Sequence, residues 1–455
     1  MPNEVDDIAT FGVSNRTKIT SSSGVVVDSI VFEPGASAYK IGPDIHAGMG
    51  LVGAGVINNS GVTQQFLVAK SSSLSFSNSA SAGSNVQTIV PGQIDDTIDG
   101  GSGNLYFNDS SSAGDGIYIC KGAETNNGGG AQVYFLGDAT AGTSTFMLQG
   151  GVIPGARGAN MSIYSASLLG SPTIVVQGGV AGSQETFVEA GGYSTGAGVR
   201  LKLFGNGNLY IGGHVLPGFT LGSVEGDGGI FLGFAGSRGR TLTVGNSLNT
   251  TFSGVIDDMG AKGSMIKIGR GRLTLTGANT YLGKTLVKQG ELLVSNTLGS
   301  GTGAGPVQVA LGTLGGTGTI SGAVTIGTGL GRGAVVAPGS NGIAIGILTI
   351  QSSLLCQSDA TYDFEVDTDT STADQLTASG VTINSGATFL PTSFGTDTLT
   401  LGITFTAINN ISATPISGTF ANLPDGGTIQ IGSNTFQANY EGGDGNDLTL
   451  TVVND

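Results

Sequence analysis

Three carboxylates alternate with apolar residues in one short acidic segment. Asp363, Glu365 and Asp367 are separated by Phe364 and Val366. In a strand, this alternation places the three carboxylates on one face, in steps of about 6.6 Å. A carboxylate pair can cleave a glycosidic bond, and carboxylate oxygens also bind divalent cations. The favoured interpretation is a solvated acidic strand face, with cation binding and catalysis as the two alternatives.

A second acidic motif lies close to the end of the chain. The segment Gly442–Leu448 reads GGDGNDL and matches a single calcium-binding nonapeptide of a parallel β-roll. In a roll, each ion takes oxygen ligands from two successive copies, and here one copy is present. We therefore predict a tight turn before the last strand. Asp444 and Asp447 join the three carboxylates above as weak metal candidates, so we predict no cofactor, with Ca²⁺ as the alternative.

Two other motifs have the spacing of enzyme loops. Gly192–Gly196 reads GYSTG, as in a nucleophile elbow, but no acid lies between Ser194 and His214 and a strand-like segment follows. The only other histidine is His46. Ala278–Thr285 satisfies a loose phosphate-loop pattern, again with a strand-like segment in place of the helix that phosphate binding requires. We predict that the chain has no catalytic residues and is not an enzyme.

The elements that would position these residues are short strands in a repeat. Four stretches share one template: a strand ending in an aromatic residue, a polar turn ending in Ala-Gly or Leu-Gly, and a short apolar strand. The aromatic anchors follow each other at spacings of 31, 28 and 29 residues, and they are Phe76, Phe107, Phe135 and Tyr164. Such a period indicates stacked units that cannot bury their apolar faces alone. The repeat therefore predicts a solenoid, for which we expect roughly 20–25 residues per coil.

Composition agrees with a solenoid. Glycine accounts for 82 of the 455 residues, there is no Trp, and no segment shows an uninterrupted helical period. The net charge of −15 disfavours binding to nucleic acid and to anionic membranes. No apolar run is long enough for a membrane-spanning helix, and the first residues lack the pattern of a signal peptide. Cys120 and Cys356 are far apart in the sequence, and we predict that both are free thiols packed inside coils.

One segment carries a specific family motif. Thr251–Asn296 resembles the autotransporter-associated β-strand repeat of bacterial surface passenger proteins. The matching positions are Leu273, Leu275, Gly277, Asn279, Thr280, Tyr281, Gly283, Leu292 and Val294. Arg272, Lys284, Leu286 and Glu291 depart from the family pattern at positions where a surface residue is compatible with the fold. The resemblance implies a secreted or surface-displayed β-helix of a Gram-negative-type bacterium.

These observations predict an all-β, right-handed parallel β-helix with a modified C-terminal unit. We divide it into entry coils (1–61), aromatic repeats (62–254), passenger-type repeats (255–353) and a C-terminal cap segment (354–455). The predicted function is that of a non-enzymatic extracellular structural protein, either a surface spacer or adhesin or a subunit of a fibre or matrix. The alternative is a protein that binds or degrades polysaccharides. Expected partners are a second copy in a head-to-tail homopolymer, and surface glycans or host matrix components, without nucleic acid or membrane insertion.

Overall fold

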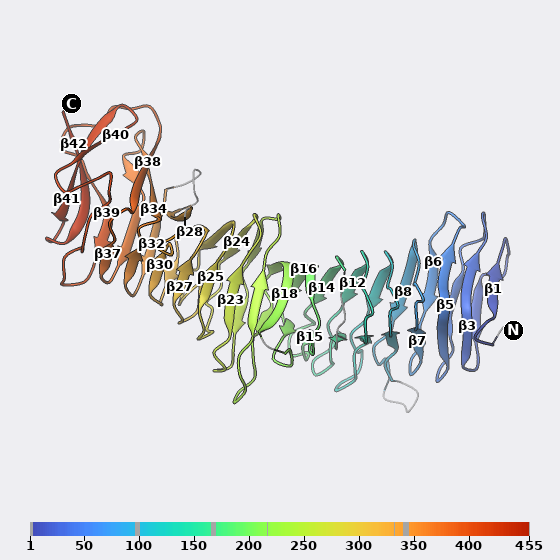
Figure 1. The fold of residues 1–455 in the computed structure, drawn as a ribbon. Coiled ribbons are helices and arrows are strands. Elements are labelled where there is room, and N and C mark those ends of the chain that lie inside the picture. The colour runs from blue at the N-terminus through green and yellow to red at the C-terminus, as the bar shows by residue number, and fades with distance from the viewer. Residues whose placement is uncertain are drawn as a thin grey trace. The chain divides into compact units, whose positions relative to one another are not determined.

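The computed structural model describes residues 3–95, 101–164, 170–215, 217–331, 333–339 and 345–454. Within these ranges the chain forms strands and no helix, so it offers no helical membrane span. The strands group into two compact units, Met1–Gly233 (unit 1) and Phe234–Asp455 (unit 2). In each unit, successive strands stack as parallel rungs (Figure 1). The predicted all-β parallel β-helix is confirmed, and its right-handed winding stays a prediction.

Unit 1 winds between two parallel sheets. Sheet A contains β1 (Ile8–Phe11), β3 (Val25–Phe32), β5 (Gly48–Asn58), β7 (Ser73–Phe76), β9 (Asn104–Phe107), β11 (Gln132–Phe135), β13 (Asn160–Ile163), β15 (Thr186–Ala190), β17 (Gly207–Tyr210) and β19 (Gly229–Phe231). Sheet B contains β2 (Lys18–Ser21), β4 (Lys40–Pro43), β6 (Gln64–Leu67), β8 (Val86–Val90), β10 (Ile117–Cys120), β12 (Thr145–Leu148), β14 (Thr173–Gln177), β16 (Gly196–Phe204) and β18 (Gly218–Gly226).

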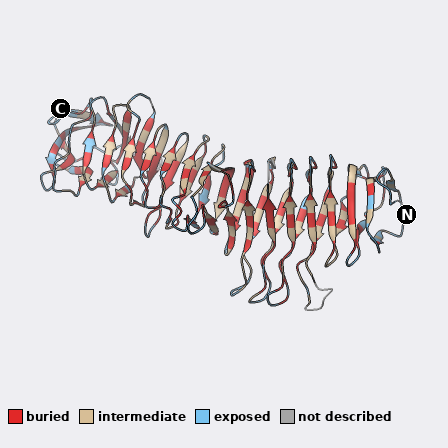
Figure 2. Ribbon diagram, turned by 60° about the horizontal axis from the view of Figure 1, so that its bottom comes forward, coloured by how far each residue is buried: buried red, intermediate tan, exposed pale blue. Residues whose placement is uncertain are grey.

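The coils of unit 1 are longer than the predicted 20–25 residues. Ser73 pairs with Asn104, and Asn104 pairs with Gln132, which are steps of 31 and 28 residues. The extra residues lie in long loops that lead from sheet B back to sheet A. Within the strands, buried and half-buried positions alternate, as expected for a sheet with one inner and one outer face (Figure 2).

The aromatic anchors form a stacked column in the core of unit 1. The Phe76 and Phe107 rings lie 5.3 Å apart, and Phe107 and Phe135 lie 4.8 Å apart, in both cases nearly parallel. The fourth predicted anchor is wrong, because Phe135 pairs with Ile163 rather than with Tyr164. A shift of one residue turns a strand position to the other face, so Tyr164 is 37% exposed while Ile163 is buried.

The small residue and glycine of each repeat fill a corner where the backbones of neighbouring coils nearly touch. Ala82 and Ala113 are buried, and Gly114 has a φ of 64°. A Cβ atom at Gly114 would lie 2.1 Å from the carbonyl oxygen of Gly83 in the preceding coil. Only glycine accommodates both this left-handed conformation and this approach, which explains the repeated Ala-Gly of the sequence.

Unit 2 has three parallel strand columns. The first is β20 (Thr241–Val244), β23 (Ser264–Lys267), β25 (Thr285–Val287), β27 (Val307–Val309), β30 (Val324–Ile326), β33 (Leu354–Cys356) and β37 (Val381–Ile383). The second is β21 (Thr250–Phe252), β24 (Arg272–Leu275), β26 (Glu291–Val294), β28 (Gly312–Gly316), β31 (Ala334–Pro338), β34 (Ala360–Asp367) and β38 (Thr388–Phe394). The third is β29 (Thr319–Ile320), β32 (Ile347–Ile350), β36 (Gln375–Ala378) and β39 (Thr404–Asn410). Two short strands, β22 (Val255–Asp257) and β35 (Thr372–Ala373), lie between the columns in sequence.

The last strands of unit 2 change from parallel to antiparallel pairing. β42 (Asp447–Val453) pairs antiparallel with both β39 and β41 (Asn434–Gly442), and β40 (Thr428–Ile431) pairs antiparallel with β41. The predicted modification of the C-terminal unit is therefore confirmed. Cys120 in unit 1 and Cys356 in unit 2 are both buried and unbridged, as predicted.

Candidate functional site

The predicted solvated face of the acidic strand is wrong. Asp363 and Glu365 lie on β34 and are 6% and 0% exposed, whereas Asp367 is half-buried. The chain folds back after Asp367, and β35 pairs antiparallel with the end of β34. This return covers the face that would otherwise meet solvent. A polymeric substrate could not reach Glu365, and this argues against a glycosidase pair at β34.

The return also adds a third carboxyl group that was not singled out in the sequence. Asp374 is fully buried and accepts hydrogen bonds from the backbone N–H groups of Gly346 at 2.7 Å and Glu365 at 3.2 Å. Burial raises the pKa of Asp374 to about 8, and the nearby Glu365 carboxylate raises it further. Burial also raises the pKa of Asp363. These groups hold the return against β34, a structural role.

The predicted turn before the last strand is present. Gly442 pairs with Asp447 across the β41–β42 hairpin, and the N–H of Gly445 donates to the carbonyl oxygen of Gly442. The Asp447 carboxylate accepts a 2.8 Å hydrogen bond from the N–H of Asn410 on β39. Asp447 therefore joins the hairpin to its neighbouring strand. Across the described ranges, no three His, Cys, Asp or Glu side chains converge as metal ligands would.

The two enzyme-like loops are followed by strands, as the sequence predicted. β25 begins at Thr285 directly after the phosphate-loop pattern, and β16 begins at Gly196 within the GYSTG motif. Ser194 and His214 do lie side by side, and both are buried. However, the His214 Nε2 atom lies 2.7 Å from the main-chain oxygen of Ser194, and Nδ1 lies 2.7 Å from the oxygen of Val215. The imidazole thus bridges two carbonyl groups instead of facing the serine hydroxyl.

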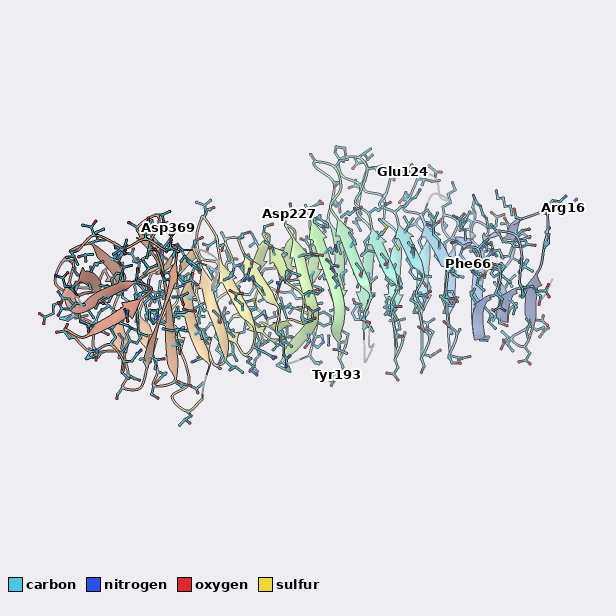
Figure 3. All side chains as sticks on the ribbon, turned by 90° about the horizontal axis from the view of Figure 1, so that it is seen from above. Arg16, Phe66, Glu124, Tyr193, Asp227 and Asp369 are labelled. Carbon is cyan, nitrogen blue, oxygen red and sulfur yellow. The ribbon has the colours of Figure 1, made fainter. Side chains whose placement is uncertain are left out.

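A groove on unit 1 has the features of a binding site. It lies where sheet B meets the long loops that follow β10, β12 and β14. In Figure 3, Glu124 marks these loops, which project from the stack on the side opposite Tyr193. One hollow of ≈ 510 Å³ runs from Lys121 to Val180, and a second of ≈ 320 Å³ shares Gln177 with it and ends at Phe204. We call this continuous feature the loop groove.

One outward side chain per coil lines the length of the loop groove. Cys120, Leu148 and Val176 are in register on β10, β12 and β14, so the residues that follow them also align. Gln177 pairs directly with Phe204. The resulting column consists of Lys121, Gln149, Gln177 and Phe204. Each member is exposed or half-buried, and Phe204 is 41% exposed.

The floor of the loop groove is bare backbone. Gly122, Gly150 and Gly178 follow the column residues, and a Cβ atom at Gly122 or Gly150 would lie 2.0 Å from backbone atoms of the next coil. Side chains are therefore sterically excluded from the floor. Val152 and Val180, 52% and 45% exposed, form the wall on the loop side.

The other wall of the loop groove belongs to sheet B. Ile119, Met147 and Val175 are in register and half-buried, forming an apolar column beside the polar one. The groove therefore combines amide groups, accessible backbone and two apolar walls. The sequence contained a signal for it, since MLQGG and VVQGG recur at Gln149 and Gln177 with the 28-residue period of the coils.

A second exposed feature is the row of aromatic residues on the outer face of sheet A. Tyr106 and Tyr134 stack 5.0 Å apart, and Tyr210 and Phe231 stack 4.7 Å apart. Because these rings face one another along the stack, the facing surfaces within each pair are already occupied. This row therefore stabilises the outer face of the sheet, and the loop groove is the stronger candidate for ligand binding.

Comparisons with known proteins assign the repeat in unit 2. Residues 265–294 match the passenger-associated-transport-repeat family. This confirms the family resemblance predicted from Thr251–Asn296, and the matched segment covers β23, β24, β25 and β26.

Two curated proteins match part of the chain. The adhesin BmaC autotransporter of Brucella suis biovar 1 (strain 1330) is 40% identical over 114 residues, which cover 23% of this chain and 3% of that protein. An extracellular serine protease of Serratia marcescens is 32% identical over 142 residues, 31% of this chain and 12% of that protein. The matches thus span only a small part of the length of either relative. Among solved structures, the Haemophilus influenzae Hap adhesin aligns over 96% of this chain and 64% of that one, with 11% identity and a TM-score of 0.29.

Proposed function

We propose that this chain, an autotransporter passenger-type repeat protein, is a non-enzymatic adhesin that acts outside a Gram-negative bacterial cell. The loop groove is the observation that carries this proposal. It joins exposed apolar side chains to a row of amides on a rigid parallel stack, a combination suited to binding a partner. The same stack would act as a spacer that holds the groove away from the cell surface.

The names of the two relatives point in different directions. One is called an adhesin and the other a serine protease. The geometry at Ser194 supports the first reading for this chain, because His214 is engaged by two carbonyl groups and the pair is buried. A serine nucleophile needs a base within hydrogen-bonding reach of its hydroxyl and access for the substrate.

We also propose that the fold needs no metal or other cofactor. The coils are joined by main-chain hydrogen bonds and apolar contacts, and Asp447 is used as an acceptor for Asn410. A chelator should therefore leave the melting temperature unchanged. A fall of several degrees after chelation, reversed by Ca²⁺, would contradict this proposal.

Head-to-tail self-association is a second candidate function, favoured by an apolar hollow of ≈ 350 Å³ in the first coils. Ile8, Phe11 and Ile19 line it, and Ile8 is 58% exposed. Burial of this hollow against another β coil would remove apolar surface from water. Light scattering at increasing concentration tests it, with Ile8→Asp as the variant expected to abolish any association.

An adhesion assay tests the main proposal. Beads coated with the folded chain should adhere to epithelial cells and extracellular matrix, and beads coated with the double variant Gln149→Ala/Gln177→Ala should adhere less. The matched control is Gln65→Ala/Gln87→Ala, which removes two hydrogen-bonded glutamines from consecutive coils of the same sheet but outside the groove. Adhesion equal to that of uncoated beads, or hydrolysis of peptide or ester substrates that Ser194→Ala abolishes, would refute an adhesin without enzymatic activity.

A further inference from the structure

We propose that the loop groove binds a neutral glycan chain laid along the direction in which the coils stack. This inference rests on the proposed adhesin function and specifies its ligand. The first argument is the repetition of the site. Lys121, Gln149, Gln177 and Phe204 occupy one position in four successive coils, so the column extends over about 14 Å in steps of about 4.8 Å. A ligand that uses the whole column must be a linear oligomer.

The second argument concerns the chemistry of the lining. Each glutamine amide both donates and accepts hydrogen bonds, as the hydroxyl groups of a sugar do. The amides of Gln149 and Gln177 lie between two apolar walls, one formed by Met147 and Val175 and the other by the exposed Val152 and Val180. A sugar ring has hydroxyl groups at its edge and C–H groups on its faces, so it matches polar and apolar surfaces placed side by side.

The third argument excludes an added peptide strand. Peptides commonly bind to sheets by pairing with a free strand edge. β10, β12 and β14 are each paired on both sides within sheet B, so this part of the sheet has no free edge. An extended peptide also repeats at about 3.3 Å per residue, out of step with coils spaced about 4.8 Å apart.

The fourth argument is the charge. Lys121 and Glu124 bring one positive and one negative side chain to the same end of the groove. The chain as a whole carries a net charge of −15, which repels polyanions such as sulfated glycans and nucleic acids. A neutral glycan meets no such barrier. Phe204 supplies an exposed ring at the far end, where a terminal sugar can pack.

The bare floor completes the site. Gly122, Gly150 and Gly178 leave the backbone uncovered because the next coil excludes any side chain. A ligand can therefore approach main-chain groups as well as the two amides. Sugars bound in this way would be held by several weak contacts repeated along the chain, so affinity should increase with the number of sugar units until the column is filled.

Calorimetry with a panel of neutral oligosaccharides tests the proposal. The panel contains oligomers of glucose, mannose, galactose and N-acetylglucosamine, from one to eight units, with heparin fragments as the polyanionic comparison. We expect binding of at least one neutral series, with affinity rising over the first three or four units and then levelling. The double variant Gln149→Ala/Gln177→Ala should bind about tenfold more weakly, as expected for the loss of two hydrogen-bonding amides. Gln65→Ala/Gln87→Ala should bind like the unmodified chain.

Three outcomes would overturn the proposal: no binding in any neutral series, tighter binding of heparin, or equal affinities for the two double variants. Circular dichroism of each variant ensures that a loss of affinity does not arise from unfolding. The adhesion assay separates the two levels of the account. Persistent adhesion without glycan binding would leave the adhesin function in place and refute its ligand, and adhesion that protease treatment of the target removes would assign a protein ligand instead. Loss of both adhesion and glycan binding would refute both.

Discussion

The rings of Phe107 and Phe135 lie nearly parallel in adjacent coils, with 4.8 Å between their centroids and 14° between their planes. This separation matches the spacing of the coils themselves, about 4.8 Å. Each ring therefore packs on its counterpart above and below, and the core of unit 1 is built by repetition of one contact.

Removal of one ring from this column should destabilise unit 1 strongly. Phe107 is fully buried, so Phe107→Ala should lower the free energy of unfolding by about 3–5 kcal/mol. Tyr106→Ala, next to it on the outer face of β9, should cost only about 1 kcal/mol. Denaturant unfolding followed by circular dichroism measures both. Equal losses for the two variants would contradict the assignment of inner and outer faces.

The glycine corner makes a sharper stereochemical prediction. Gly114→Ala forces a side chain into a left-handed backbone conformation and against the oxygen of Gly83. We expect a loss of more than about 2 kcal/mol in stability. The control is Gly24→Ala, where no atom lies within 4 Å of the added Cβ, and the change should be within about 0.5 kcal/mol. Similar melting temperatures for the two variants would refute the close approach of the coils.

The sequence predicted the stacked core better than it predicted the exposed features. The period of the aromatic anchors identified Phe76, Phe107 and Phe135, because a repeated strand places equivalent residues in one column. It failed at Tyr164, since the fourth repeat is offset by one residue and an aromatic side chain there turns outward. Periodicity locates the coil, but the face depends on a register that one residue can change.

The acidic strand and the loop groove show why sites were harder to predict. The alternation of Asp363 and Glu365 correctly placed both on one face, but the return through Asp374 that buries this face depends on a tertiary fold-back. The groove was missed because its lining comes from single residues of four coils. Gln149 and Gln177 acquire a common role only when the 28-residue period becomes a 4.8 Å spacing, about the distance between neighbouring strands.

Asp374 should give unit 2 a distinct pH dependence. Its folded-state pKa of about 8 lies above its ordinary value of 3.8, so the folded state retains a proton that the unfolded state loses. Stability from this group is complete below pH 3.8 and is lost as the pH rises through 8. We expect Asp374→Asn to flatten the fall in melting temperature between pH 5 and pH 8. The control Asp367→Asn should not, because hydrogen bonds from Thr370 lower the pKa of Asp367. An unchanged slope in Asp374→Asn would show that another group is responsible.

Both thiols should be inert in the folded protein. Burial raises the pKa of Cys356 to about 12 and also raises that of Cys120, so neither supplies a reactive thiolate at neutral pH. A thiol reagent such as dithionitrobenzoate should react with two groups per chain after denaturation and with none before it. A cysteine introduced at the exposed Thr143 should react at once in the folded state. Rapid native-state reaction of Cys120 would contradict its place inside a coil.

The binding surface itself can be mapped by hydrogen–deuterium exchange. The chain would be compared with and without a saturating concentration of the tightest-binding neutral oligosaccharide, with peptide-level mass spectrometry as the readout. The account predicts slower exchange in segments 121–130, 149–159 and 177–185, and no change in the outer tyrosine row at Tyr106 and Tyr134 or in unit 2. Protection confined to that tyrosine row or to unit 2, with the three loop segments unchanged, would contradict the central claim that the loop groove is where this protein binds its partner.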